Sequence, residues 1–209
     1  AALVREELPH VLEAVTAIRL ELDGQAPLIG FSAAPWTLFY YMVGGSSKKN
    51  QQEGERWLAE HEEASTRLLD SLCTVVIEYL SLQVESGAQM LQVFEAMGEF
   101  ITPPSFEKYA LPYMERIARE LQERHPEVPL MVFPRGASYA LPQLQAAGYD
   151  VLTLDASIPQ EEARALLPGA CLQGSFDPAE LVTGTPGSVR AGAHAMLDRL
   201  GPKQLIANL

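Results

Sequence analysis

Short apolar runs alternate with segments of helical periodicity along the whole chain, and this alternation most strongly limits its possible folds. Runs that are almost uninterrupted in apolar character are typical of parallel strands buried on both faces. The segments between them repeat apolar residues at three- and four-residue steps, which is the pattern of amphipathic helices. The runs predict strands over residues 27–31, 88–95, 129–133, 149–155, 170–176 and 204–209.

The helical segments predict a layer of helices that packs on the sheet. The segment 53–84 is long enough for two helices, and several others end at glycine or proline, which are common helix-stop residues. The order of strands and helices indicates an α/β fold with parallel strands and right-handed crossovers. The other expected helices cover residues 3–22, 103–124, 141–147, 159–167 and 186–200.

Two architectures fit this alternation. One is a doubly wound open sheet. The other is a (β/α)8 barrel, which needs eight strands and typically about 250 residues. The chain has 209 residues, and its last expected strand is followed by no helix. No linker, low-complexity segment or internal repeat divides it, so we expect a single domain over residues 1–209.

Composition excludes several classes of protein. With 15 basic and 27 acidic residues, the formal net charge is −12, which disfavours binding to a nucleic-acid backbone. Apolar residues make up 47% of the chain, enough to exclude a disordered protein. Cys73 and Cys171 lie far apart and indicate small core residues in a reducing compartment. We expect no metal site, because the histidines show no ligand spacing; they are His10, His61, His125 and His194.

One segment imitates a membrane span, since residues 24–47 carry no charge. A span needs about 20 consecutive apolar residues, whereas prolines and glycines such as Pro27, Gly30 and Pro35 interrupt this segment. We therefore expect a buried strand that runs into an active-site loop. The chain opens on Ala1 without a basic and then an apolar stretch, so we expect no secretory signal and a processed or truncated N-terminus.

Aromatic side chains gather after the expected strands, where both architectures place their functional loops. Phe31, Trp36, Tyr41 and Phe94 predict an aromatic mouth. Such a mouth suits a large, flat, partly apolar ligand. The segment after the first strand, GFSAAPW, matches neither the dinucleotide fingerprint nor the phosphate-binding loop.

A few charged residues also follow strand ends. Arg135 comes one residue after the third strand, where its guanidinium suits a carboxylate, although an ordinary surface arginine fits equally well. Asp155 and Asp177 are each either an acid or base or the first residue of a helix. The sequence Asp177-Pro178 favours the helix cap.

Five segments of the chain resemble the uroporphyrinogen decarboxylase family. Residues 31–45, FSAAPWTLFYYMVGG, resemble the family's F-A-G-A-P-W-T-L-x-x-Y-M-x-x-G-G segment. Residues 87–95, GAQMLQVFE, are similar to its G-A-Q-x-x-Q-x-F-E/D strand. Residues 147–155, 172–178 and 206–209 match further family segments in the same order, and the resemblance covers nearly the whole chain.

This resemblance implies a (β/α)8 barrel, incomplete here with about six parallel strands, in a divergent algal or plastid-type member. The family forms homodimers, uses no cofactor and converts the four acetate side chains of uroporphyrinogen to methyl groups, giving coproporphyrinogen and CO2 for heme and chlorophyll synthesis. By resemblance, Tyr41 is the catalytic tyrosine, and Phe31 and Phe94 line the cleft against the macrocycle. Arg135 and Ala96 complete the expected substrate contacts. The implied location is the plastid or the cytoplasm.

The chain departs from the family at several points. Ala96 stands where the family has serine, and Ala156 stands where the family often has tryptophan. The family's clamping arginines and pyrrole-binding aspartate belong to its first two strands, so the resemblance covers strands three to eight and implies that residues 1–209 alone are inactive. Two alternatives stay open: a non-catalytic subunit of a larger assembly, and a sister methyltransferase, which needs a zinc–thiolate centre.

Overall fold

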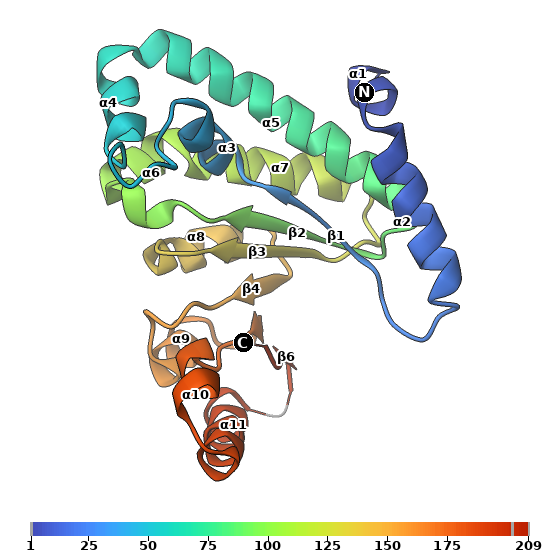
Figure 1. Ribbon diagram of the computed structural model, residues 1–209, viewed down its shortest axis with the longest axis vertical. Helices are drawn as coiled ribbons and strands as arrows, with labels where there is room; N and C mark the ends of the chain where they lie inside the picture. The colour runs from blue at the N-terminus through green and yellow to red at the C-terminus, as the bar shows by residue number, and fades with distance from the viewer. Residues whose placement is uncertain (1, 202, 209) are drawn as a thin grey trace.

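The computed structural model describes residues 2–201 and 203–208 and contains a six-stranded parallel sheet (Figure 1). Each strand overlaps the run that predicts it, although β4, β5 and β6 are shorter than expected. The bounds are β1 (Ile29–Ala33), β2 (Met90–Glu95), β3 (Leu130–Pro134), β4 (Val151–Thr153), β5 (Cys171–Gln173) and β6 (Leu205–Ile206).

The order of the strands decides between the two architectures. The sheet runs β1-β2-β3-β4-β5-β6, and each neighbouring pair is parallel. A doubly wound sheet reverses its order at a switch point, whereas strands that follow one another around the sheet form the wall of a (β/α)8 barrel. The described sheet is open, with β1 and β6 at its two edges, as predicted from the sequence.

Helices connect the strands, and the long helices α5 and α7 pack against each other beside β1 and β2 (Figure 1). Short 3-10 turns, η1 (Gly98–Phe100) and η2 (Ser138–Ala140), follow β2 and β3. The helices are α1 (Ala2–Glu7), α2 (Pro9–Glu21), α3 (Pro35–Met42), α4 (Glu53–Glu60), α5 (Glu62–Glu85), α6 (Pro103–Tyr109), α7 (Leu111–Arg124), α8 (Leu141–Ala146), α9 (Gln160–Leu166), α10 (Pro178–Thr183) and α11 (Pro186–Leu200).

Proline divides two of the predicted helices. The segment 3–22 becomes α1 and α2, with a break at Leu8, because a residue that precedes proline is disfavoured in the helical conformation. The segment 103–124 becomes α6 and α7, with a break at Ala110. Pro112 has no backbone N–H to continue the hydrogen-bond pattern of the preceding turn.

The prediction of an active-site loop directly after the first strand is wrong, because residues 35–42 form helix α3. Pro35 suits the first turn of a helix, and the next glycine is Gly44, so nothing within the segment breaks a helix. The uncharged segment 24–47 therefore contains a strand and a short helix. Within the described residues, no helix has the length and apolar character needed to cross a membrane.

The two faces of the sheet have different neighbours. Residues that alternate along the strands, such as Leu91, Val132 and Leu152, belong to one buried cluster with residues of α3, α5, α7 and α8. Met131 and Val151 are also buried but lie outside that cluster, because their side chains point to the opposite face. The helices thus cover one face, which we call the convex face, and the other is the concave face of a barrel wall.

Candidate active site

Three aromatic rings form a row on the concave face, near the carboxyl ends of three adjacent strands. The ring centroids of Phe31 and Phe94 lie 5.8 Å apart with an interplanar angle of 88°. Those of Phe94 and Phe133 lie 6.2 Å apart at 80°. The structure therefore brings together Phe31 and Phe94, as predicted from sequence, and adds Phe133. The sequence signal for Phe133 is its register, because it pairs directly with Phe94.

The backbone of Phe31 is held firmly although its side chain is 60% exposed. The side-chain amide of Gln83 in α5 donates to the Phe31 carbonyl oxygen at 3.0 Å and accepts from the Phe31 N–H at 3.0 Å. Gln83 is itself buried. This pair of bonds satisfies both polar backbone groups of an edge-strand residue, so the ring is presented to solvent on a fixed support.

A row of polar side chains lies on the same face beside these rings, since Gln92 pairs directly with Phe31. The Gln92 amide donates to the Thr153 hydroxyl at 3.4 Å, and that hydroxyl donates to Gln173 Oε1 at 2.8 Å. All three residues are buried. The concave face therefore combines aromatic rings with hydrogen-bonding groups beside them, which suits a ligand that is flat, apolar in its faces and polar at its centre or edges.

Two residues of the predicted aromatic mouth lie on α3, in different surroundings. Trp36 is fully buried, and its indole Nε1 donates to the Met97 carbonyl oxygen at 3.1 Å. The prediction that Trp36 belongs to the aromatic mouth is wrong, because its ring packs on the convex side with that of Phe39. Tyr41 is 44% exposed at the end of α3, and its ring meets that of Tyr40. Its position in one cleft with the phenylalanines stays a prediction.

A buried carboxyl group, which the sequence interpretation missed, ends strand β2. Glu95 is fully buried, and its Oε1 accepts hydrogen bonds from the Thr37 hydroxyl at 2.6 Å and from the Met97 N–H at 3.0 Å. Its Oε2 has no hydrogen-bond partner among the described residues. Burial raises the pKa of Glu95 to about 7, although these two hydrogen bonds act in the opposite direction.

The expected substrate contacts Ala96 and Arg135 follow the ends of β2 and β3. Ala96 is half-buried, and its N–H donates to the Thr37 hydroxyl at 2.8 Å. The Arg135 guanidinium lies 3.3 Å from the carboxylate of Glu99, with about half of each side chain exposed. Arg135 is thus an accessible rim residue with a carboxylate partner, and its role toward a ligand stays a prediction.

The loops after β2 and β3 meet through two glycines. A Cβ atom on Gly98 would lie 2.6 Å from the Arg135 carbonyl oxygen. A Cβ atom on Gly136 would lie 2.6 Å from the Glu99 N–H nitrogen, and Gly136 also has a φ of +75°. Each glycine therefore permits a backbone-to-backbone contact that another residue would prevent.

The two aspartates that follow strand ends hold nearby backbone by accepting hydrogen bonds from its N–H groups. Asp155 accepts from the Gly136 N–H at 2.7 Å, the Ser157 N–H at 2.8 Å and the Ser138 hydroxyl at 3.2 Å. Burial alone would raise the pKa of Asp155, but these hydrogen bonds outweigh burial and lower it. Asp177 accepts from the Ala179 N–H at 2.9 Å at the start of α10, which confirms the predicted helix cap.

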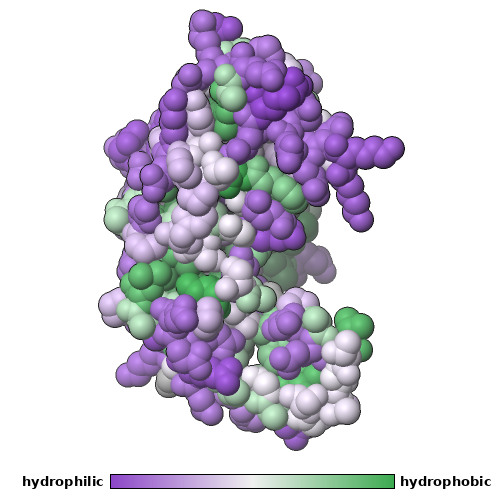
Figure 2. Space-filling model, turned by 90° about the vertical axis from the view of Figure 1, so that its left-hand side faces the viewer, coloured by the Kyte–Doolittle hydropathy of each residue, from purple (hydrophilic) through white to green (hydrophobic). Residues whose placement is uncertain are grey.

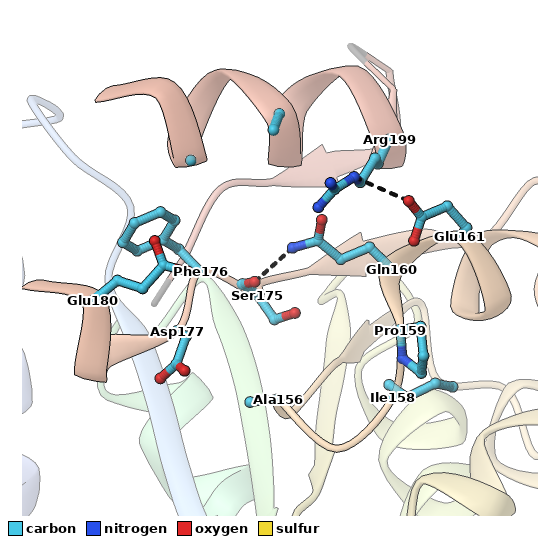
Figure 3. A pocket seen from close by; sticks show the side chains of 12 residues that line it. Ala156, Ile158, Pro159, Gln160, Glu161, Ser175, Phe176, Asp177, Glu180 and Arg199 are labelled. Atoms are coloured by element: carbon cyan, nitrogen blue, oxygen red, sulfur yellow. Dashed lines mark hydrogen bonds and ion pairs between the residues drawn. The ribbon is translucent and has the colours of Figure 1, made fainter. Parts of the chain in front are cut away.

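A separate cavity of about 500 Å³ lies below this region, between α9, α10 and α11 (Figure 3). The Gln160 amide donates to the Ser175 carbonyl oxygen at 2.7 Å, and Arg199 of α11 reaches across to Glu161 at 2.9 Å. With Glu180 at its other end, the cavity carries more acidic than basic groups. It therefore suits an acidic ligand less well than the aromatic face does.

The hydropathy of the surface at the carboxyl ends of the strands varies from one region to another. Figure 2 shows it hydrophilic at the top, over α4 and the start of α5, with hydrophobic patches at mid-height and a mixed surface below them. A partly apolar ligand would be accommodated by the central region.

Comparison with known proteins identifies the family. Residues 2–209 match the family model for uroporphyrinogen decarboxylase (URO-D). The chain is 44% identical over 207 residues to the uroporphyrinogen decarboxylase of Salinibacter ruber, and 38% identical over 212 residues to that of Homo sapiens, with 99% of the chain aligned in each case. The chain belongs to the uroporphyrinogen decarboxylase family. It spans 58% of the length of each of these two relatives.

A solved structure supports the fold assignment. A B12-independent methionine synthase from Shewanella sp. W3-18-1 superposes with a TM-score of 0.59 over 94% of this chain and 57% of its own, at 12% identity. A likeness at this identity shows the fold alone. The uroporphyrinogen decarboxylase fold is a (β/α)8 barrel, and the six consecutive strands agree with the predicted incomplete barrel.

The surroundings of the two cysteines are those of packing residues of the fold. Cys73 is buried in α5, where burial raises the pKa of its thiol to about 12 and its Sγ donates to the Tyr113 carbonyl oxygen at 3.6 Å. Cys171 is partly buried on β5. In the described part of the chain, no three His, Cys, Asp or Glu side chains gather as a metal site. The identity to decarboxylases favours that family over the methyltransferase alternative.

Proposed function

We propose that the full-length protein containing this chain is a uroporphyrinogen decarboxylase. It removes the four acetate carboxyl groups of uroporphyrinogen as CO2, leaves methyl groups and so produces coproporphyrinogen for heme synthesis. The observation that carries this proposal is the row Phe31–Phe94–Phe133 on the open concave face, in a chain of this family.

The chemistry of the substrate fits this face. A porphyrinogen has a broad ring, central pyrrole N–H groups and acidic arms, so it needs apolar walls, hydrogen-bond acceptors and cationic clamps. The aromatic row supplies walls, the polar row with Gln92 and Gln173 supplies amide oxygens, and Arg135 supplies one accessible cation at the rim.

Each acetate loses CO2 after its pyrrole ring is protonated; the methylene group that remains takes up a proton to become methyl, and the ring releases the proton that it gained. The positive charge that develops on the ring is stabilised by a fixed carboxylate. By family resemblance, this carboxylate and further arginines belong to strands that precede β1. Within this chain we assign Tyr41 as the catalytic residue whose hydroxyl hydrogen-bonds the reacting acetate, and Phe31, Phe94, Ala96 and Arg135 as substrate contacts.

We also propose that the full-length protein is a homodimer in the plastid or the cytoplasm, and that in a plastid its product serves chlorophyll as well as heme synthesis. The two cysteines support a reducing compartment, because Cys73 and Cys171 are both free thiols. Sedimentation analysis and microscopy of a tagged full-length protein test these two points.

Turnover of uroporphyrinogen by the full-length protein tests the function. We expect coproporphyrinogen, identified after oxidation by chromatography with standards, and no product from residues 1–209 alone. The variant Ala96→Ser restores the hydroxyl found in the family, and we expect it to raise kcat/KM severalfold. A folded full-length protein without turnover, with or without this serine, would overturn the proposal and favour a non-catalytic subunit.

A further inference from the structure

The carboxyl group of Glu95 lies inside the wall of the candidate site, on the side away from any ligand. Phe94 points to the concave face, and the next side chain of a strand points to the opposite face. Glu95 accordingly is fully buried on the convex side beneath α3. It therefore cannot contact a ligand on the concave face, and any effect on the reaction passes through its neighbours.

Those neighbours form a directional chain of hydrogen bonds. The Thr37 hydroxyl donates its only proton to Glu95 Oε1 at 2.6 Å, so its lone pairs remain free to accept the Ala96 N–H at 2.8 Å. The Met97 N–H donates to the same Oε1 at 3.0 Å. One carboxylate oxygen thus fixes two successive backbone amides of the loop after β2.

Glu95 connects three segments of the rim, two through its carboxylate and one through its main-chain carbonyl. Thr37 belongs to α3, which carries Tyr41 at its other end. Met97 is held again through its carbonyl oxygen, which accepts from the Trp36 indole at 3.1 Å. The main-chain carbonyl of Glu95 accepts from the Arg135 N–H at 2.9 Å. Helix α3 and the loops after β2 and β3 therefore share one anchor point.

We propose that Glu95 is a positioning residue for the decarboxylation: its buried carboxylate locks the Ala96–Met97 loop to α3 and so sets the places of Phe94, Ala96 and Tyr41 against the substrate. This inference rests on the proposed function. It adds a residue that never touches substrate and acts through Thr37 and the two loop amides.

We expect the anchor to respond to protonation of Glu95 near neutral pH. Burial raises the pKa of Glu95 to about 7, and a neutral carboxyl group accepts hydrogen bonds more weakly than a carboxylate. The groups that face it are the Thr37 hydroxyl and backbone from α3 and the Met97 N–H from its own loop. Tyr139 of η2 is a titratable group on a neighbouring element; burial chiefly raises its pKa, and the charges of Glu107 and then Glu95 raise it further. We expect the anchor to weaken as pH falls below about 7.

The test uses the full-length protein and the variants Glu95→Gln, Thr37→Val and Thr37→Ser. We expect Glu95→Gln to lower kcat by about tenfold or more with a smaller change in KM, because misplacement of reacting groups acts mainly on the chemical step. We also expect the wild-type kcat to fall between pH 8 and pH 6, and the kcat of Glu95→Gln to lack this fall. Thr37→Val should resemble it, while Thr37→Ser, which keeps the hydroxyl, should retain most activity.

A spectroscopic measurement separates this inference from the proposed function. In protein labelled with 5-fluorotryptophan, the 19F resonance of Trp36, assigned with Trp36→Phe, reports on the bond to Met97. We expect it to titrate with a midpoint near pH 7 in wild type and not in Glu95→Gln. Circular dichroism and thermal melting establish that the variants are folded.

Each outcome is decisive. A folded Glu95→Gln variant with wild-type kcat and pH profile would overturn the positioning role. A Trp36 resonance that titrates equally in both proteins would show that another group controls the loop, and would overturn it as well. If the wild-type protein has no decarboxylase activity but the titration depends on Glu95, the proposed function fails while the anchor itself is established.

Discussion

The indole Nε1 of Trp36 donates a hydrogen bond to the carbonyl oxygen of Met97, at 3.1 Å. Trp36 lies in the first turn of α3 and is fully buried, whereas Met97 belongs to the loop after β2. The rim of the candidate site is therefore built on a core side chain, and the stability of the fold and the shape of the site depend on the same residue.

Replacement of Trp36 by phenylalanine should lower the free energy of unfolding by about 1–3 kcal/mol, because it removes buried ring volume and one of the two hydrogen bonds to the Met97 carbonyl oxygen, which keeps only the bond from the Phe100 N–H. Urea denaturation measures this as a lower midpoint at unchanged slope. Trp57→Phe is the matched control, since Trp57 is only partly buried in α4. Equal losses in the two variants would contradict the prediction.

Replacement of Phe31 by alanine should weaken porphyrin binding by about tenfold, because a ring that stacks on or borders a flat ligand contributes on the order of 1–2 kcal/mol. The side chain is 60% exposed, so unfolding should change by less than about 1 kcal/mol. Fluorescence titration of the full-length protein with coproporphyrin measures the affinity. Val182→Ala, at an 86% exposed residue of α10, should leave it unchanged; equal weakening in both would refute a role for the ring.

Replacement of Arg135 by alanine should raise KM for uroporphyrinogen severalfold, and the effect should shrink as salt screens the charge. Stability should change by less than about 1 kcal/mol, because the ion pair with Glu99 is exposed. Kinetics at two salt concentrations provide the measurement. Arg67→Ala removes an exposed, paired arginine of α5 and should change nothing; an Arg135→Ala variant with the wild-type KM would show that this residue is an ordinary surface arginine.

Replacement of Asp155 by asparagine should destabilise the fold at neutral pH and less so in acid. The folded-state pKa of Asp155 is lowered, so its contribution is fully present above the unfolded-state pKa of about 4 and is lost as pH falls through the folded value. Urea unfolding of both proteins from pH 7 to pH 3 should show the difference shrinking below about pH 4. Asp198→Asn, at an exposed position of α11, is the control. A constant difference across this range would exclude the charge as the cause.

Periodicity was sufficient for the order of strands and helices, because parallel strands and amphipathic helices impose different spacings on the same apolar residues. It did not separate a helix from a loop at residues 35–42, where every position of the short segment is uncharged and the α3 residues are largely buried. Pro9 and Pro112, which follow Leu8 and Ala110, could have predicted that the helices divide at these positions.

The candidate site was only partly predictable. Phe31 and Phe94 were placed by their positions near the ends of adjacent strands, and the structure brings their rings together. Trp36 is also an aromatic residue after a strand, but it lies on the convex side. The alternation of side chains that assigns a strand residue to one face does not apply to a residue of a helix, so the sequence could not place it. Glu95 was missed because a carboxylate in an apolar run shows its surroundings only once Thr37 and Met97 are folded against it.

The close approach of Gly98 to the Arg135 carbonyl oxygen, and of Gly136 to the Glu99 N–H, joins the loops after β2 and β3 into one unit. Main chain rests on main chain there, with no flexible side chain between the two loops to absorb a displacement. A ligand that pushes on either loop must therefore carry the other with it, so selection among ligands at this rim depends on the shape of a preformed surface rather than on independent adjustment of its parts.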